Sequence, residues 1–182
     1  MSSSVASRRR TLVGAGEIER IIARLAHQIV EPEGAQEGLY LIGIRRGGEA
    51  VAQRLAAQIE RITGSRPALG FLNINLYRDD DVSHELPDSQ IPDDLNGKTV
   101  VIIDDVLMTG RTVRSALDAV TDLGRPAAVR LCVLVDRGMR ELPVQGDYVG
   151  RFIPTSSRER VVVRLSAKAA DDDEVTLVAD DA

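Results

Sequence analysis

The chain has 182 residues, of which 43% are hydrophobic and 28% are charged, values that are ordinary for one globular domain. Its formal net charge is −5, but the last twelve residues hold six acids and no base, so the remainder carries 23 bases against 22 acids. This balance excludes a protein whose whole surface attracts nucleic acid and leaves room only for a local basic patch.

Two further features concern the setting of the protein. No apolar run approaches the length of about 18 residues that a membrane-spanning helix needs, and no signal peptide is visible. The single cysteine, Cys132, lies within an apolar run, which predicts core packing rather than a nucleophile and excludes an intramolecular disulfide. We therefore expect a cytoplasmic protein with a disordered tail at 1–10, a single domain at 11–182 and an acidic tail from 171.

The first predicted elements lie between residues 14 and 59. Apolar residues at helical spacing predict an amphipathic helix over 14–30. The apolar run at 39–44 (LYLIGI) predicts a buried strand, which leads through Arg45, Arg46, Gly47 and Gly48 into a second helix. Two arginines and two glycines after a strand favour an anion site, because bare N–H groups and guanidinium groups share one turn. A solvated basic turn is the alternative.

The next segment changes from a strand to a long polar connection. Partial alternation over 69–77 predicts a strand near the edge of the sheet. Residues 78–97 are mostly polar and contain two prolines. A connection of this length without regular structure is often a functional loop, so we expect a flexible lid here.

Residues 100–112 (VVIIDDVLMTGRT) are the most informative stretch. Four apolar residues predict a strand that is buried on both faces, and helical spacing begins again at Arg111. The turn between them contains Thr109 and Gly110, where backbone N–H groups and the helix dipole favour an anion. Asp104 and Asp105 would repel a bare phosphate, but they can accept hydrogen bonds from a sugar diol and hold Mg²⁺ through water. A phosphorylated ribose would satisfy both halves.

The last third of the chain predicts a strand at 127–135, a cap of short irregular segments (the hood, 136–156) and closing strands at 161–165 and 175–178. Together the elements predict an α/β fold with an open, mainly parallel twisted sheet flanked by helices. Ligands bind such sheets beyond the carboxyl ends of the strands, so loops 44–48, 78–97, 104–112 and 136–154 should meet there.

Residues 100–112 resemble the phosphoribosyl pyrophosphate (PRPP) signature of the type I phosphoribosyltransferases. Further motifs resemble the PyrR family, which combines attenuation of pyrimidine operons with uracil phosphoribosyltransferase activity. They are LYRDD at 76–80, DLGRP at 122–126 and LVDRG…RELPV…DYVG…IPTS over 134–156. The resemblance spans about residues 11–165 and implies the type I phosphoribosyltransferase fold, with uracil, PRPP and UMP as ligands and Mg²⁺ as cofactor.

The resemblance also implies roles for individual residues. Asp104 and Asp105 would contact the ribose hydroxyls and hold the metal, and the hood would recognise uracil largely through its backbone. Catalytic roles are implied for Asp104, Asp105, Arg45 and the loop residue Arg78. The implied ligand-binding set includes Arg45 and Arg46 near pyrophosphate and Thr109, Gly110, Arg111 and Thr112 around the 5′-phosphate. Its other members are Gly47, Leu107, Met108, Arg137 and Ile153.

The family's second activity is the binding of pyrimidine leader mRNA, for which Arg24, Arg140 and Arg151 are the candidates. The family pattern has histidine where this chain has Met139 and arginine where it has Gln145, so two cations are missing. Three functions stay open: a uracil phosphoribosyltransferase, an RNA-binding regulator with little catalysis, and a transferase for a purine base. The resemblance also implies a homo-oligomer.

Overall fold

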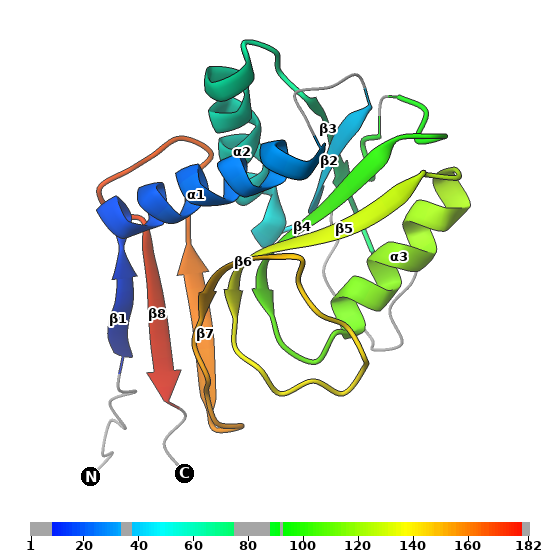
Figure 1. Cartoon of the computed structure of the whole chain (residues 1–182). Helices are drawn as coiled ribbons and strands as arrows, with labels where there is room; N and C mark the ends of the chain where they lie inside the picture. The colour runs from blue at the N-terminus through cyan, green and yellow to red at the C-terminus, as the bar shows by residue number, and fades with distance from the viewer. Residues whose placement is uncertain (1–8, 34–37, 75–87, 92, 180–182) are drawn as a thin grey trace, which may run out of the picture.

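Five parallel strands form the main sheet of the computed structural model, which describes residues 9–33, 38–74, 88–91 and 93–179 (Figure 1). Their order across the sheet is β3 (Ala68–Leu72), β2 (Leu39–Ile44), β4 (Thr99–Leu107), β5 (Ala128–Asp136) and β6 (Tyr148–Phe152). Each neighbouring pair is parallel. The predicted open α/β sheet is thus confirmed, with β3 at one edge as its partial alternation indicated.

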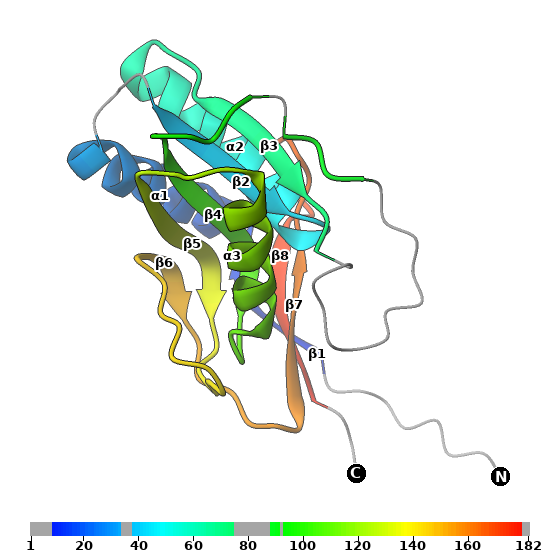
Figure 2. The same cartoon turned by 90° about the vertical axis from the view of Figure 1, so that its right-hand side faces the viewer.

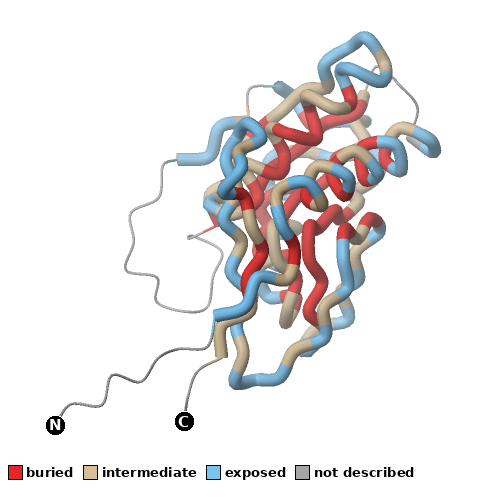
Figure 3. The backbone as a smooth tube through the Cα atoms, turned by 90° about the vertical axis from the view of Figure 1, so that its left-hand side faces the viewer, coloured by how far each residue is buried: buried red, intermediate tan, exposed pale blue. Residues whose placement is uncertain are grey.

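Helices cover both faces of this sheet (Figure 2). Helices α1 (Ala15–Glu33) and α2 (Gly47–Thr63) lie on one face, where Leu41, Val101 and Ile103 join their buried side chains in one hydrophobic cluster. Helix α3 (Arg111–Leu123) covers the other face, against Ile42 and Ile102. Because successive residues of a strand point to opposite faces, one apolar run supplies both clusters. In Figure 3 much of the central strands and parts of the helices are coloured as buried.

A separate three-stranded antiparallel sheet holds the two ends of the described chain. Its order is β1 (Arg9–Gly14), β8 (Glu174–Ala179) and β7 (Glu159–Arg164). The expected disordered tail at 1–10 therefore extends two residues too far, and the expected acidic tail from 171 contains a strand. The reason is cross-strand pairing: Glu174 contacts Arg9 and Arg164, at 2.5 and 3.6 Å.

The expected hood at 136–156 also needs a correction. Residues 148–152 are not part of an irregular cap but form β6, which extends the main sheet at the edge beside β5. Asp147 initiates this pairing, since its backbone N–H donates to the Leu131 carbonyl and its carboxylate accepts from the Leu131 N–H. The irregular parts of the hood are 137–147, which we call the hood loop, and 153–156.

A buried ion network ties the small sheet to the helices. Arg54 of α2 is 5% exposed and contacts Glu19 of α1 and Asp173, the latter at 2.5 Å. Asp173 also accepts hydrogen bonds from the N–H groups of Ser166 and Ala170, both at 3.0 Å. Burial acts to raise the pKa of Asp173, but these two hydrogen bonds and Arg54 outweigh it and hold the pKa below its usual range.

Replacement of Arg54 by methionine is expected to lower the free energy of unfolding by about 3 kcal/mol, because Asp173 would stay buried without its cation. Urea unfolding at pH 7 measures this loss.

Since the pKa of Asp173 is depressed in the folded state, its ionic stabilisation is present at neutral pH and fades as the pH falls through that pKa. The stability difference between the natural protein and D173N should therefore shrink in acid; a difference that stayed constant down to pH 2 would contradict this role.

Candidate active site

The carboxyl ends of β2 and β4 mark the point where the connections of the main sheet change direction. From β2 the chain passes through α2 to the edge strand β3, and from β4 it passes through α3 to β5 on the other side. In Figure 1 the arrowheads, which mark the carboxyl ends of these strands, point toward the same end of the sheet. Open parallel sheets bind ligands in the crevice at such a switch point, so the two turns predicted to meet are indeed neighbours.

The glycines of the β2 turn allow this close approach. A Cβ atom on Gly47 would lie closer than 3.0 Å to the carboxyl group of Asp105, and one on Gly48 would overlap the carbonyl oxygen of Ile103. Only a residue without a side chain lets the start of α2 lie this close to β4. The β2 turn and the carboxylates of β4 therefore lie side by side.

Arg45 is fixed where β2 ends. Its N–H donates to the Leu72 carbonyl at 2.9 Å, and its guanidinium forms an ion pair with Glu49 at 2.7 Å. The guanidinium carbon also lies 5.5 Å from the centre of the Phe71 ring, within cation–π range. The side chain is 7% exposed, and its buried Nε has no hydrogen-bond partner among the described residues. Arg46 follows through a cis peptide bond and is exposed.

Asp104 and Asp105 lie within β4, which continues to Leu107 instead of ending at the apolar run. The Oδ1 atom of Asp104 accepts from the N–H of Asp105 at 2.9 Å, and that of Asp105 accepts from the N–H of Val106 at 2.8 Å. Burial raises the pKa of Asp105 above its usual value. A cation or ligand hydroxyl beside this carboxylate would favour its ionised form.

The turn after β4 has the features predicted for an anion site. Gly110 has a φ of 92° and precedes the first residue of α3, Arg111. The hydroxyl of Thr109 accepts from the N–H of Arg111 at 3.3 Å. Leu107 is buried, Met108, Thr109 and Thr112 are half-buried, and Arg111 is exposed. The N-terminus of α3 thus lies at the carboxyl ends of the strands, as the β2 turn does, and carries the positive end of the helix dipole.

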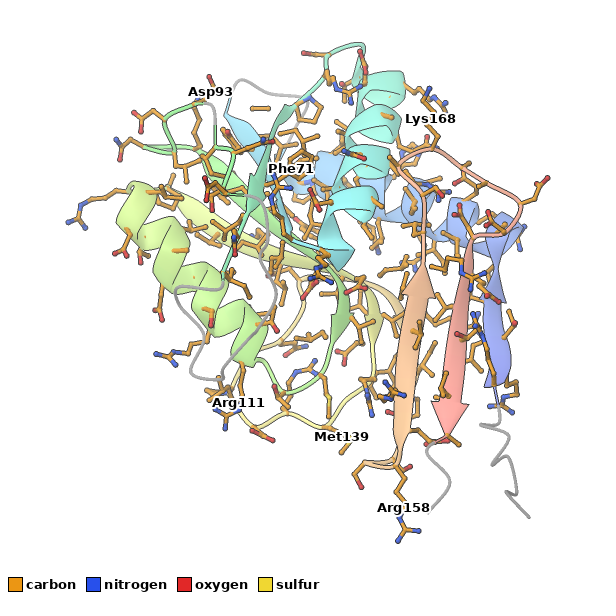
Figure 4. The ribbon with its side chains drawn as sticks, turned by 180° about the vertical axis from the view of Figure 1, so that it is seen from behind. Phe71, Asp93, Arg111, Met139, Arg158 and Lys168 are labelled. Atoms are coloured by element: carbon orange, nitrogen blue, oxygen red, sulfur yellow. The ribbon has the colours of Figure 1, made fainter. Side chains whose placement is uncertain are left out.

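The hood loop packs against this anion-site turn. The N–H groups of Glu141 and Leu142 donate to the Thr109 carbonyl at 3.0 and 3.1 Å, and the Glu141 carboxylate pairs with Arg111 at 2.8 Å. In Figure 4, Arg111 and Met139 lie at this end of the molecule and Asp93 at the opposite end. The hood loop therefore forms one wall of the site.

The remaining predicted hood residues serve largely to hold the loop. Arg137 is 5% exposed; it donates through Nε to the Thr155 hydroxyl at 2.7 Å and through Nη2 to the carbonyls of Ser156 and Glu159 at 3.0 and 2.6 Å. Burial lowers the pKa of this guanidinium. The N–H of Ile153 donates to the Asp136 carbonyl at 2.8 Å.

Cys132 lies in β5 and is fully buried, as the apolar run predicted. Burial raises the pKa of its thiol to about 12. Because the thiolate is the reactive form, this cysteine is not a nucleophile near neutral pH.

Three site features were not singled out from the sequence. These are the contact of Gly48 with β4, the stacking of Phe71 on Arg45, and the ion pair of Asp136, at the end of β5, with Arg140 at 2.5 Å. The signal for Asp136 was present, since it follows a buried apolar run as Asp104 does. Arg78, the predicted catalytic residue of the lid, lies outside the described residues.

The candidate RNA-binding arginines differ in their contacts. Arg24 and Arg151 line a groove of about 330 Å³ between α1 and β6, together with Glu17, Arg20, Ile21 and Gly150. Arg151 pairs with Glu17, and Arg24 donates to the Gly150 carbonyl. Arg140 instead points into the hood loop, where its Nη1 donates to the Met108 carbonyl at 2.8 Å.

Comparisons with known proteins agree with this geometry. The model of the phosphoribosyl transferase domain family matches residues 11–168. The chain is 48% identical over 172 residues to the bifunctional protein PyrR of Chloroflexus aurantiacus, covering 92% of this chain and 94% of that protein. It is 51% identical over 152 residues to the bifunctional protein PyrR of Pelotomaculum thermopropionicum, covering 81% and 84%.

Solved structures with the same fold include the hypoxanthine phosphoribosyltransferase of Trypanosoma cruzi, with a TM-score of 0.71, 19% identity, and coverage of 93% of this chain and 96% of that one. The hypoxanthine phosphoribosyltransferase of Staphylococcus aureus has a TM-score of 0.65 at 23% identity, covering 81% and 79%. At these identities the likeness concerns the fold alone. No helix in the described ranges is long and apolar enough to cross a membrane. The chain belongs to the PyrR family, and its residues 11–168 form a phosphoribosyl transferase domain.

Proposed function

We propose that this protein transfers the phosphoribosyl group of PRPP to uracil, which yields UMP and pyrophosphate. The observation that carries the proposal is the contact between Gly47 and the Asp105 carboxyl group. This contact lies between the turn that contains Arg45 and the carboxylates of β4, and α3 begins a few residues further along the chain. A ligand with a phosphate at one end, a diol in the middle and a pyrophosphate at the other end would use all three.

Each part of this ligand has a matching group. Thr109, Gly110, Arg111 and Thr112 would bind the 5′-phosphate through backbone N–H groups and hydroxyls at the start of α3. Asp104 and Asp105 would accept hydrogen bonds from the ribose hydroxyls. Arg45, Arg46 and Gly47 would hold the pyrophosphate. The Nε of Arg45, which has no hydrogen-bond partner among the described residues, supports this role. Arg78 would join them from the lid.

Uracil would bind against the hood loop, which includes Arg137, and against Leu107, Met108 and Ile153. The guanidinium of Arg137 is engaged by the segment 155–159, so we expect it to shape the base site rather than to contact the base with its side chain. The Ile153 N–H is also engaged, which leaves its carbonyl and side chain for the ligand. The base would thus be recognised mainly by backbone groups.

The donor set suits Mg²⁺, the cofactor that this chemistry implies. Asp104 and Asp105 offer carboxylate oxygens. Burial raises the pKa of Asp105, and a bound cation would offset this cost of keeping the carboxylate ionised. Within the described residues no group of three potential ligands from His, Cys, Asp and Glu occurs, which fits an ion that keeps water and substrate oxygens in its shell. When bound, Mg²⁺ would neutralise charge on the departing pyrophosphate.

The residues of the chain would act by position and charge. The uracil nitrogen would form a bond to C1 of the ribose as the bond from C1 to the pyrophosphate oxygen breaks, and the proton lost from that nitrogen would pass to the departing pyrophosphate or to water. Positive charge that develops on the ribose is favoured by the nearby carboxylates, and negative charge on the leaving group by Arg45. Holding both reactants in one crevice supplies a large part of the acceleration.

The direct test is to incubate the protein with Mg²⁺, PRPP and uracil and to measure UMP, with hypoxanthine and guanine in parallel reactions. We expect UMP from uracil and no product from the purines. Conversion of a purine alone would make the protein a purine phosphoribosyltransferase, and no conversion with any base would favour a regulator with little catalysis.

A second function, the binding of pyrimidine leader mRNA, is favoured by the groove that holds Arg20, Arg24 and Arg151. Met139 and Gln145 replace two cations of the family pattern, so this groove would carry more of the phosphate contacts. The double variant R24Q/R151Q should weaken RNA binding and reduce the slope of log K against log salt by about 2, roughly one for each lost cation. An unchanged slope would exclude this groove as the RNA site.

A further inference from the structure

The aromatic ring of Phe71 supports the guanidinium group of Arg45 where β2 ends. The guanidinium carbon lies over this ring, 5.5 Å from its centre. In the register of the parallel strands β2 and β3, Phe71 lies beside Gly43, which has no side chain that could separate the ring from Arg45. Figure 4 labels Phe71 on β3. Because the Arg45 side chain is only 7% exposed, little water screens this contact.

The backbone of Phe71 is held on both sides of its strand. On the outer side, the N–H of Phe71 donates to the Gln90 carbonyl at 2.8 Å, and the N–H of Gln90 donates to the Phe71 carbonyl at 2.7 Å. On the inner side, the carbonyl of the next residue, Leu72, accepts from the N–H of Arg45 at 2.9 Å. The ring therefore extends from a fixed backbone position and can act as a rigid support.

The ring leaves hydrogen-bond donors of Arg45 available for a ligand. A guanidinium group carries five N–H donors, and an aromatic face attracts its charge through the ring quadrupole. Glu49 accepts from Nη1 at 2.7 Å, and the buried Nε has no partner among the described residues. A second carboxylate in place of the ring would add negative charge where we propose that pyrophosphate binds. An uncharged ring holds the cation without this repulsion.

We propose that Phe71 is a positioning residue for phosphoribosyl transfer, which holds the Arg45 guanidinium in the orientation that binds the pyrophosphate group of PRPP. The inference rests on the proposed transferase activity and on the role given there to Arg45. It predicts an effect confined to ligands that carry pyrophosphate, because the ring acts on the cation at that end of the site. Ribose 5-phosphate, which has no pyrophosphate, should bind independently of Phe71.

The test compares F71L with F71Y and with a control in the same strand, L69I. Leucine is apolar like phenylalanine but has no aromatic face, whereas tyrosine keeps that face. Leu69 and Phe71 line one groove of about 450 Å³ beside residues 89–91. L69I therefore controls for a change of side-chain shape in this part of the sheet.

We expect F71L to weaken the binding of magnesium pyrophosphate about tenfold in a calorimetric titration, and to lower kcat/KM for PRPP by a similar factor. F71Y and L69I should stay within about twofold of the natural protein. The affinity for ribose 5-phosphate and the KM for uracil should be unchanged in all three variants. In the background of R45Q, which lacks the cation, F71L should cause no further loss, because the ring and the cation act as one unit.

Pyrophosphate binding that F71L leaves intact would overturn the inference. An equal loss of affinity for pyrophosphate and ribose 5-phosphate would also overturn it, as would an F71Y variant as impaired as F71L, because both results indicate a packing role. F71M takes the place of F71L if leucine lowers the melting temperature below that of the assay.

Failure of the proposed function has a different signature. If pyrophosphate binding and transfer depend on the Phe71 ring as expected but the base converted is a purine, the proposed substrate is wrong and the inference stands. If the natural protein converts uracil but F71L changes neither pyrophosphate binding nor kcat/KM for PRPP, the proposed function stands and the inference is wrong.

Discussion

Replacement of both Asp104 and Asp105 by asparagine is expected to reduce UMP formation by on the order of 10³-fold, because the site would lose both negative charges that face the ribose and the metal. The reaction of uracil with PRPP, followed at saturating Mg²⁺, measures this loss. Asparagine keeps the Oδ1 acceptors for the N–H groups of Asp105 and Val106, so the local backbone should be preserved. Turnover that stayed within tenfold of the natural enzyme would exclude these carboxylates from the chemistry.

The single variant D105N is expected to change stability in the opposite direction to activity. Burial raises the pKa of Asp105, which means that folding favours its protonated form, and its ionised form at neutral pH costs stability that is recovered as the pH falls. D105N should therefore melt at or above the temperature of the natural protein at pH 7, with the difference shrinking in acid. A variant that is inactive and also strongly destabilised would show only that the protein had unfolded.

Alanine substitutions at Gly47 and Gly48 are expected to separate activity from stability. In G47A the new methyl group meets the Asp105 carboxylate, a side chain that can turn away. Displacing this carboxylate by about an ångström should lower kcat/KM by about 100-fold, with little change in unfolding free energy. Steady-state kinetics and urea unfolding of the same preparation measure both quantities.

In G48A the methyl group meets the carbonyl oxygen of Ile103, which is part of the backbone of β4 and cannot turn away. We expect a loss of about 2–3 kcal/mol in unfolding free energy. G97A offers a comparison outside the site, although the positive φ of 69° at Gly97 introduces a backbone cost of its own. Equal effects of G47A and G48A on both measurements would contradict the distinction between side-chain and backbone contact.

The stretch 100–112 shows how far local sequence reaches. Its apolar run, its two carboxylates and its Thr-Gly-Arg-Thr turn predicted a buried strand, a polar strand end and a helix start, all of which the structure contains. These features follow from side-chain period and from backbone conformation within a few residues, so they can be predicted without the rest of the chain. The partner turn at 45–48 was predictable for the same reason.

What only the tertiary structure decided involves partners far apart in sequence. Residues 148–152 form a strand because they pair with the edge of β5. Asp173 and Glu174 belong to the folded domain rather than to an acidic tail, because they form ion pairs with Arg54 and Arg9. Arg140 is a second example. The sequence shows only a charged residue in a loop, whereas in the fold its guanidinium pairs with Asp136 and donates to the Met108 carbonyl. The sequence cannot distinguish an exposed arginine from one that donates to buried acceptors, because the fold decides which groups lie within hydrogen-bond distance.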